Sequence, residues 1–160
     1  MNALRTIIGI DPGYGRIGVG VIRQEQSHLR CIAYECIAPP KGVFVDRLFM
    51  IYTSLSDLFI RHKPAIVSVE KLYFFKNTAT AIDVSQARGV ILLAARVLNI
   101  PICEYTPLQV KQAISGYGMA DKQQVQRMVK ILLKLPTIPR PDDAADALAL
   151  AICASTVKKI

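Results

Sequence analysis

The stretch TIIGIDPGYGRIGVGVIR (residues 6–23) contains two apolar runs separated by a turn. The first run ends at Asp11, and Pro12 and Gly13 then break the apolar pattern. Because Pro and Gly favour turns and both runs are rich in β-branched residues, this stretch predicts a strand, a turn and a second strand. A third β-rich run covers residues 31–37. The N-terminal part of the chain therefore predicts a three-stranded meander.

The rest of the chain alternates between helical and strand patterns. From Val45, apolar residues recur at three- and four-residue steps, which is typical of an amphipathic helix. A Thr-Pro pair at 106–107 and an Asp121–Gln124 capping pair predict two further helix starts. The predicted helices cover residues 45–63, 78–98, a segment from 106, 121–135 and 142–157, and the further strands cover 65–70 and 101–105. This order predicts an α/β fold, a five-stranded mixed sheet flanked by helices.

The composition is that of a basic globular chain. It has 160 residues, a formal net charge of +8 and 52% apolar residues, which excludes a disordered chain and fits a single domain over residues 1–160. No window approaches the ~18 apolar residues of a membrane span, and the first residues lack the pattern of a signal peptide, so we expect a cytoplasmic protein without a membrane partner. The positive charge is equally compatible with a nucleic-acid partner and with a merely soluble surface.

Four carboxylates lie in apolar surroundings at the ends of predicted elements. Asp11 follows the first strand, Glu70 ends the fourth, and Asp143 and Asp146 lie three residues apart on the last helix. Buried acids are costly unless they are paired, and the sequence places no Lys or Arg beside Asp11 or inside the last helix. An all-oxygen cluster suits Mg²⁺ or Mn²⁺ rather than zinc. The alternative is a set of structural turn and cap residues.

Helical spacing does not decide between two neighbouring acids. Asp142 and Asp143 are separated from Asp146 by four and three residues, and both spacings fit a shared helix face. The residue pattern therefore leaves this choice open.

An ordered set of motifs resembles the RuvC-type Holliday junction resolvases, which have a ribonuclease-H-like fold. The motifs are GIDPG (9–13), VEKLYFFKN (69–77), QARGV (86–90), QVKQAISGYGMADKQQVQRMV (109–129), LLKLP (132–136) and DAADALALAI (143–152). The resemblance covers nearly the whole chain. It implies a ribonuclease-H-like nuclease domain.

The resemblance also implies an activity and a metal site. A family member cuts four-way junction DNA by two symmetric nicks, leaving 5′-phosphate and 3′-hydroxyl ends. The matched metal ligands and catalytic residues are Asp11, Glu70, Asp143 and Asp146, and the DAADAL motif selects Asp143 over Asp142. We expect two Mg²⁺ ions per active site, with Mn²⁺ able to substitute.

DNA contacts are expected from basic and aromatic residues. Lys111 and Lys122 match family positions that contact DNA. Tyr73 matches an aromatic position that stacks on a base near the crossover, and Lys76 beside it is expected to bind DNA. The alternative for the aromatic residues is packing under a loop.

The resemblance further implies a homodimer that acts with the RuvA and RuvB branch-migration proteins. The apolar helix at 78–98 is the expected dimer interface, and its alternative is a helix wholly buried within one subunit. Residues 83–86 depart from the leucine-glycine pair typical of many members, which affects the interface and not catalysis. Two other functions remain open, a basic junction-binding protein that does not cut, and a ribonuclease-H-like nuclease that acts on RNA–DNA hybrids.

Overall fold

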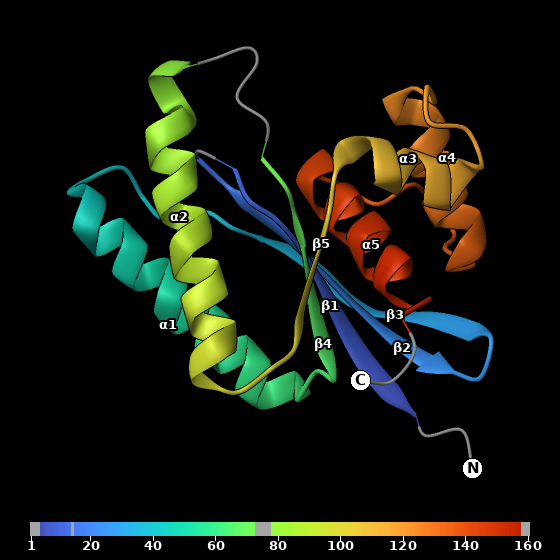
Figure 1. Ribbon diagram of the computed structural model, residues 1–160, viewed down its shortest axis with the longest axis horizontal. Helices are drawn as coiled ribbons and strands as arrows, with labels where there is room; N and C mark the ends of the chain where they lie inside the picture. Colours follow the sequence, from blue (N-terminus) through green and yellow to red (C-terminus); the bar gives the residue numbers. More distant parts are fainter. Residues whose placement is uncertain (1–3, 14, 73–77, 158–160) are drawn as a thin grey trace.

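A five-stranded mixed sheet runs through the centre of the computed structural model, which describes residues 4–13, 15–72 and 78–157 (Figure 1). The strands are β1 (Arg5–Asp11), β2 (Ile17–Glu25), β3 (His28–Ile37), β4 (Ile66–Glu70) and β5 (Ile102–Tyr105). Their order across the sheet is β3-β2-β1-β4-β5. The first three strands pair antiparallel, and β1, β4 and β5 pair parallel. The predicted meander and mixed sheet are confirmed, with β3 beginning earlier than expected.

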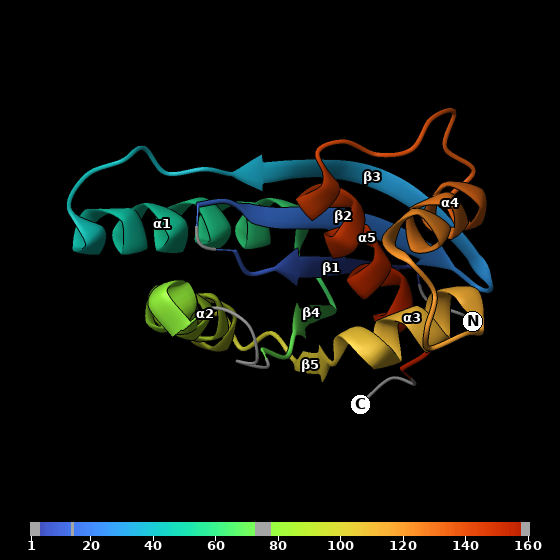
Figure 2. The same cartoon turned by 90° about the horizontal axis from the view of Figure 1, so that it is seen from above.

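Two groups of helices cover the two faces of this sheet (Figure 2). The helices are α1 (Phe44–His62), α2 (Thr78–Val97), α3 (Pro107–Ser115), α4 (Lys122–Leu132) and α5 (Asp142–Ala154). Helices α1 and α2 lie on one face, and α5, with α3 and α4 behind it, lies on the other. In the described part of the chain, no helix combines the length and the apolar character that a membrane crossing needs.

Each face of the sheet has its own hydrophobic core. Alternate residues of β1 point to opposite faces, so Ile7 packs with α5 whereas Ile8 and Ile10 pack with α1 and α2. Helix α2 is not wholly buried, because Ile82, Leu93 and Val97 expose more than half of their surface. The alternative of a fully buried helix at 78–98 is therefore wrong for this chain.

The predicted helix starts are confirmed, and two predicted helix ends are wrong. Thr106 and Asp121 cap α3 and α4, and each forms a capping box with the glutamine three residues later. Helix α4 ends at Leu132 rather than residue 135, because Lys134 adopts a positive φ of 52°. Helix α5 ends at Ala154 rather than residue 157, where two hydroxyl side chains donate hydrogen bonds to the last carbonyls.

Glycines let the backbone of α5 lie directly on β1 and β2. A Cβ atom on Gly9 would lie 1.9 Å from the carbonyl oxygen of Ala147, and one on Gly18 would lie 1.9 Å from that of Asp143. Real side chains do not tolerate such distances, so these strand positions require glycine for close approach. This contact fixes the height and rotation of α5 over the sheet.

Candidate active site

Asp11 and Glu70 end two neighbouring parallel strands. In the β1–β4 register Ile10 pairs with Val69, and each acid is the next residue along its strand. Because the strands are parallel, both carboxylates leave the sheet at the same edge. The two acids lie close enough for the charge of Glu70 to act on Asp11.

Asp143 and Asp146 reach the same edge from the first turns of α5. The contact of Gly18 with the Asp143 carbonyl seats this end of the helix on β2. Asp11 is subject to the charges of both helix acids as well as that of Glu70. The structure thus brings the four sequence-predicted acids together at one end of the molecule.

Burial and mutual repulsion perturb three of these acids. Burial raises the pKa of Asp11 well above its ordinary value, and the charges of Glu70, Asp146 and Asp143 raise it further. Burial, followed by the charge of Asp146, raises the pKa of Glu70 to about 7. Burial also raises the pKa of Asp146, although Lys122 opposes this rise. These carboxyl groups therefore ionise together only if positive charge nearby compensates them.

Two basic side chains supply part of that compensation. The Lys122 ammonium lies 3.1 Å from Oδ2 of Asp146, and the Arg16 guanidinium lies 3.0 Å from Oδ2 of Asp143. Neither partner is adjacent to its acid in the sequence, and so the sequence pattern did not reveal them. Burial would lower the pKa of Lys122, but its contact with Asp146 and the neighbouring negative charges raise it.

The structure distinguishes Asp142 from Asp143. Asp142 forms ion pairs with Arg140 and with Lys122, the latter at 3.6 Å, and lies toward solvent. Asp143 instead lies within electrostatic reach of Asp11. The backbone packing of α5 sets this rotation, which helical spacing alone leaves undetermined.

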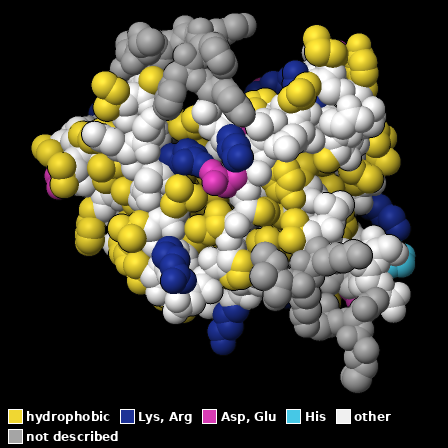
Figure 3. Space-filling model, in the orientation of Figure 1, with side chains coloured by type: hydrophobic (Ala, Val, Ile, Leu, Met, Phe, Trp, Pro, Cys, Tyr) yellow, Lys and Arg dark blue, Asp and Glu magenta, His cyan; other side chains and the backbone are white. Residues whose placement is uncertain are grey.

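A small cavity joins two of the acids to the two predicted DNA-binding lysines. It has a volume of about 180 Å³, and Glu70, Asp146, Lys111 and Lys122 lie in its wall. Its remaining lining consists of apolar side chains from α3, α4 and α5. Lys111 and Lys122 therefore lie in the same cavity wall as two of the acids. On the face drawn in Figure 3, Lys and Arg side chains likewise lie against a small acidic patch.

The acid cluster fits a divalent cation, although it is not a closed metal cage. Within the described ranges, no three or more His, Cys, Asp or Glu side chains form a group that could hold a metal ion. Oδ2 of Asp143 is nevertheless buried and accepts no hydrogen bond from the described residues, in spite of the nearby Arg16. All candidate donors are carboxylate oxygens, which Mg²⁺ and Mn²⁺ prefer. A cation would supply the charge compensation that the two basic residues give only in part.

One residue outside the predicted set also supports the site. Arg88 donates a hydrogen bond from Nε to the carbonyl oxygen of Glu70 at 3.2 Å and forms an ion pair with Glu104 of β5. It ties α2 to the end of β4. The sequence placed Arg88 in the QARGV motif without giving it a role.

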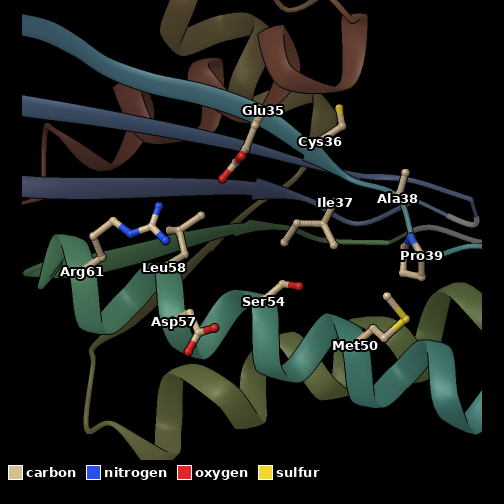
Figure 4. Close-up of a pocket in the computed structure, with 10 residues that line it drawn as sticks. All are labelled: Glu35, Cys36, Ile37, Ala38, Pro39, Met50, Ser54, Asp57, Leu58 and Arg61. Carbon is tan, nitrogen blue, oxygen red and sulfur yellow. The ribbon is translucent and has the colours of Figure 1, made fainter.

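The predicted DNA-binding residues Tyr73 and Lys76 lie outside the described residues. A larger cavity of about 390 Å³ lies between β3 and α1 (Figure 4). Its charged residues are Glu35 from β3 and Asp57 and Arg61 from α1. None of the four candidate acids lines it, so it is separate from the acid cluster.

Comparison with known proteins identifies the family. Residues 7–154 match the RuvC family, described as crossover junction endodeoxyribonuclease RuvC. The crossover junction endodeoxyribonuclease RuvC of Petrotoga mobilis is 55% identical over 148 residues, covering 92% of this chain and 91% of the relative.

Solved structures agree with this match. A structure of Thermus thermophilus RuvC is 34% identical with a TM-score of 0.87, covering 94% of this chain and 93% of the other. A complex of T. thermophilus RuvC with Holliday junction substrate is 32% identical with a TM-score of 0.84, covering 94% and 92% of the two chains. The chain belongs to the RuvC family of crossover junction endodeoxyribonucleases, on the ribonuclease-H-like fold.

Proposed function

We propose that this chain resolves Holliday junctions by nicking two opposing DNA strands, with Asp11, Glu70, Asp143 and Asp146 as its metal ligands. The observation that carries the proposal is the meeting of these acids at one edge of the sheet, in a chain whose family cuts crossover junctions. The reaction is hydrolysis of a phosphodiester, leaving 5′-phosphate and 3′-hydroxyl ends. Such ends can be rejoined by a ligase.

Family membership implies dependence on a divalent metal, and we propose two Mg²⁺ ions, with Mn²⁺ as a substitute. Bound at these acids, such ions would supply an activated water and stabilise charge on the phosphate and the leaving oxygen. The protein's own contribution is a set of carboxylates held by strand ends and by the backbone contact of α5. The choice of Asp143 over Asp142 is supported by the ion pairs of Asp142 with Arg140 and Lys122.

The basic residues of the pocket orient the DNA. Lys111 and Lys122 lie in the wall shared with Glu70 and Asp146, where a scissile phosphate would enter. Lys122 also neutralises Asp146, and a cation bound at the acids would leave its ammonium available to a phosphate. Tyr73 and Lys76 are proposed to contact the DNA near the crossover on the basis of the family motif.

A homodimer matches the symmetry of the substrate. A four-way junction is close to two-fold symmetric, and a C2 dimer places two active sites in that relation. The exposed side chains of Ile82, Leu93 and Val97 give α2 an apolar outer face suited to this interface. Replacing Leu93 with Arg should convert a dimer into a monomer in analytical ultracentrifugation, and an unchanged mass would contradict the assignment of this interface. We further propose, on the family resemblance, action with RuvA and RuvB on cytoplasmic DNA.

The first experiment is a nicking assay on a labelled four-way junction, a linear duplex of the same sequence and an RNA–DNA hybrid. Symmetric nicks on the junction that require Mg²⁺ and disappear in EDTA are the expected result. Junction binding without nicks in Mg²⁺ or Mn²⁺ would favour the non-cleaving binding protein. Preferential cutting of the hybrid would favour another ribonuclease-H-like nuclease. Asp11→Asn should abolish the nicks and retain junction binding.

A further inference from the structure

Arg16 occupies a position that the backbone fixes beside the acid cluster. It precedes the first residue of β2 and follows the turn that leaves β1. A Cβ atom on Gly13 would lie 2.2 Å from the carbonyl oxygen of Arg16, so the backbone of Arg16 lies directly against Gly13. The backbone of Arg16 therefore lies close to the end of β1.

The same backbone packing places Asp143 opposite Arg16. Gly18, two residues further along, lies directly beneath the carbonyl of Asp143, where no side chain fits. The side chains of Arg16 and Asp143 consequently meet at 3.0 Å. The backbone contacts at Gly13 and Gly18 thus bring the two residues that form this ion pair close together.

The two partners of this ion pair differ in their exposure to solvent. The Arg16 side chain is 57% exposed, whereas Oδ2 of Asp143 is buried and accepts no hydrogen bond from the described residues. Arg16 can therefore move into solvent without uncovering the core, but its departure leaves a buried carboxylate oxygen without a partner. A buried anionic oxygen in this state attracts a replacement cation strongly.

We propose that Arg16 is a positioning residue that holds the Asp143 carboxylate and competes with the divalent cation for it. The inference rests on the proposed function, because it takes Asp143 as a metal ligand. While Arg16 is paired, the acid cluster is neutralised in part and is not closed around a metal. Cation binding displaces the guanidinium, so the strength of this ion pair sets the metal concentration at which the site fills.

Lys122 cannot perform this function for Asp143. Its ammonium is shared between Asp146, at 3.1 Å, and Asp142, at 3.6 Å. Within the described residues, the ion pair of Asp143 is the one with Arg16. The two basic residues thus act on different carboxylates, and their effects on metal binding can be separated by mutation.

The proposal is tested by measuring Mn²⁺ binding in the absence of DNA. Electron paramagnetic resonance of the free ion reports how much Mn²⁺ is bound. Arg16→Gln should bind Mn²⁺ about 2- to 5-fold more tightly than the wild type, the range that a partly exposed ion pair supports. Arg16→Lys keeps the charge and should restore affinity close to the wild-type value. Arg127→Gln is the matched control, because Arg127 hydrogen-bonds to Gln123 on the exposed face of α4.

Thermal unfolding gives a second readout. In EDTA, Arg16→Gln should unfold at a lower temperature than the wild type, and saturating Mn²⁺ should remove or reverse that difference. In the Asp143→Asn background, Arg16→Gln should no longer change Mn²⁺ affinity, because the two residues act through one contact.

Each contrary result has a definite meaning. Equal or weaker Mn²⁺ binding by Arg16→Gln overturns the inference, as does equal tightening by Arg127→Gln, which would indicate a general charge effect. If the wild type nicks junctions in Mg²⁺ and either result is obtained, the proposed function stands and the inference alone fails. A wild type that neither nicks nor binds Mn²⁺ would refute both.

Discussion

Replacing Glu70 with Gln should stabilise the metal-free protein at alkaline pH. Burial and the charge of Asp146 raise the pKa of Glu70 from 4.5 to about 7. Between these values the folded state keeps a proton that the unfolded chain has released. Wild-type stability therefore falls as pH rises from about 4.5 through 7, since the folded state binds more protons than the unfolded state. The glutamine side chain does not titrate, so the Glu70→Gln variant should not show this decrease in stability.

The size of the effect follows from the same pKa. A rise from 4.5 to about 7 corresponds to about 3 kcal/mol once both states are ionised, and partial solvent access reduces this to about 2 kcal/mol. For a chain of this length, that is a gain of about 4–8 °C in unfolding temperature at pH 8. The charge of Glu70 also raises the pKa of Asp11, so the substitution relieves a second acid in the same direction.

The assay is equilibrium unfolding in urea with EDTA, at pH 5 and pH 8. The variant should exceed the wild type by about 2 kcal/mol at pH 8 and by much less at pH 5. Excess Mg²⁺ should stabilise the wild type more than the variant and narrow the gap. Glu25→Gln, at the exposed end of β2, is the matched control. A Glu70→Gln variant no more stable than the wild type at pH 8, or a gain independent of pH, would refute the reasoning.

Three other experiments test different parts of the structure. In single-turnover assays, Asp143→Asn should reduce junction cleavage at least 100-fold, while Asp142→Asn changes it less than about 3-fold. The reverse pattern would identify Asp142, not Asp143, as the metal ligand. Lys111→Ala should weaken junction binding and lower the slope of log affinity against log salt by about 0.9, and an unchanged slope would exclude a phosphate contact. Gly9→Ala should destabilise the fold by more than about 3 kcal/mol in urea unfolding, because its Cβ would meet the carbonyl of Ala147, and near-normal stability would contradict that close contact.

The sequence predicted the elements that have one apolar and one polar face, and those that are apolar on both faces, because both kinds leave a clear apolar pattern. Strand β1, the first part of β2 and helix α5 have nearly continuous apolar runs, and the glutamine three residues after Asp121 identified the start of α4. Helix ends were less predictable, because the positive φ of Lys134 that ends α4 is not a property of lysine in general. Such an end is imposed by the packing that follows it.

The candidate acids were predictable, whereas their basic partners were not. Asp11 and Glu70 end apolar runs, and Asp143 and Asp146 stand at the start of another, so this local pattern is visible in the sequence. The pairing of Arg16 with Asp143 joins the first connection of the chain to its last helix and exists only once α5 is seated on β2. The choice between Asp142 and Asp143 likewise depends on the rotation of α5, which no spacing rule contains.

The glycine contact between α5 and the sheet also constrains how this family member can evolve. Where a side chain meets a side chain, a substitution on one side can be accommodated by a smaller residue on the other. At Gly9 and Gly18 the neighbour is the main chain of α5, which no substitution can shrink. Any change there must shift the helix, and the helix carries Asp143 and Asp146. A substitution at this contact therefore changes the geometry of the acid cluster as well as the stability of the fold, and the two cannot be adjusted independently.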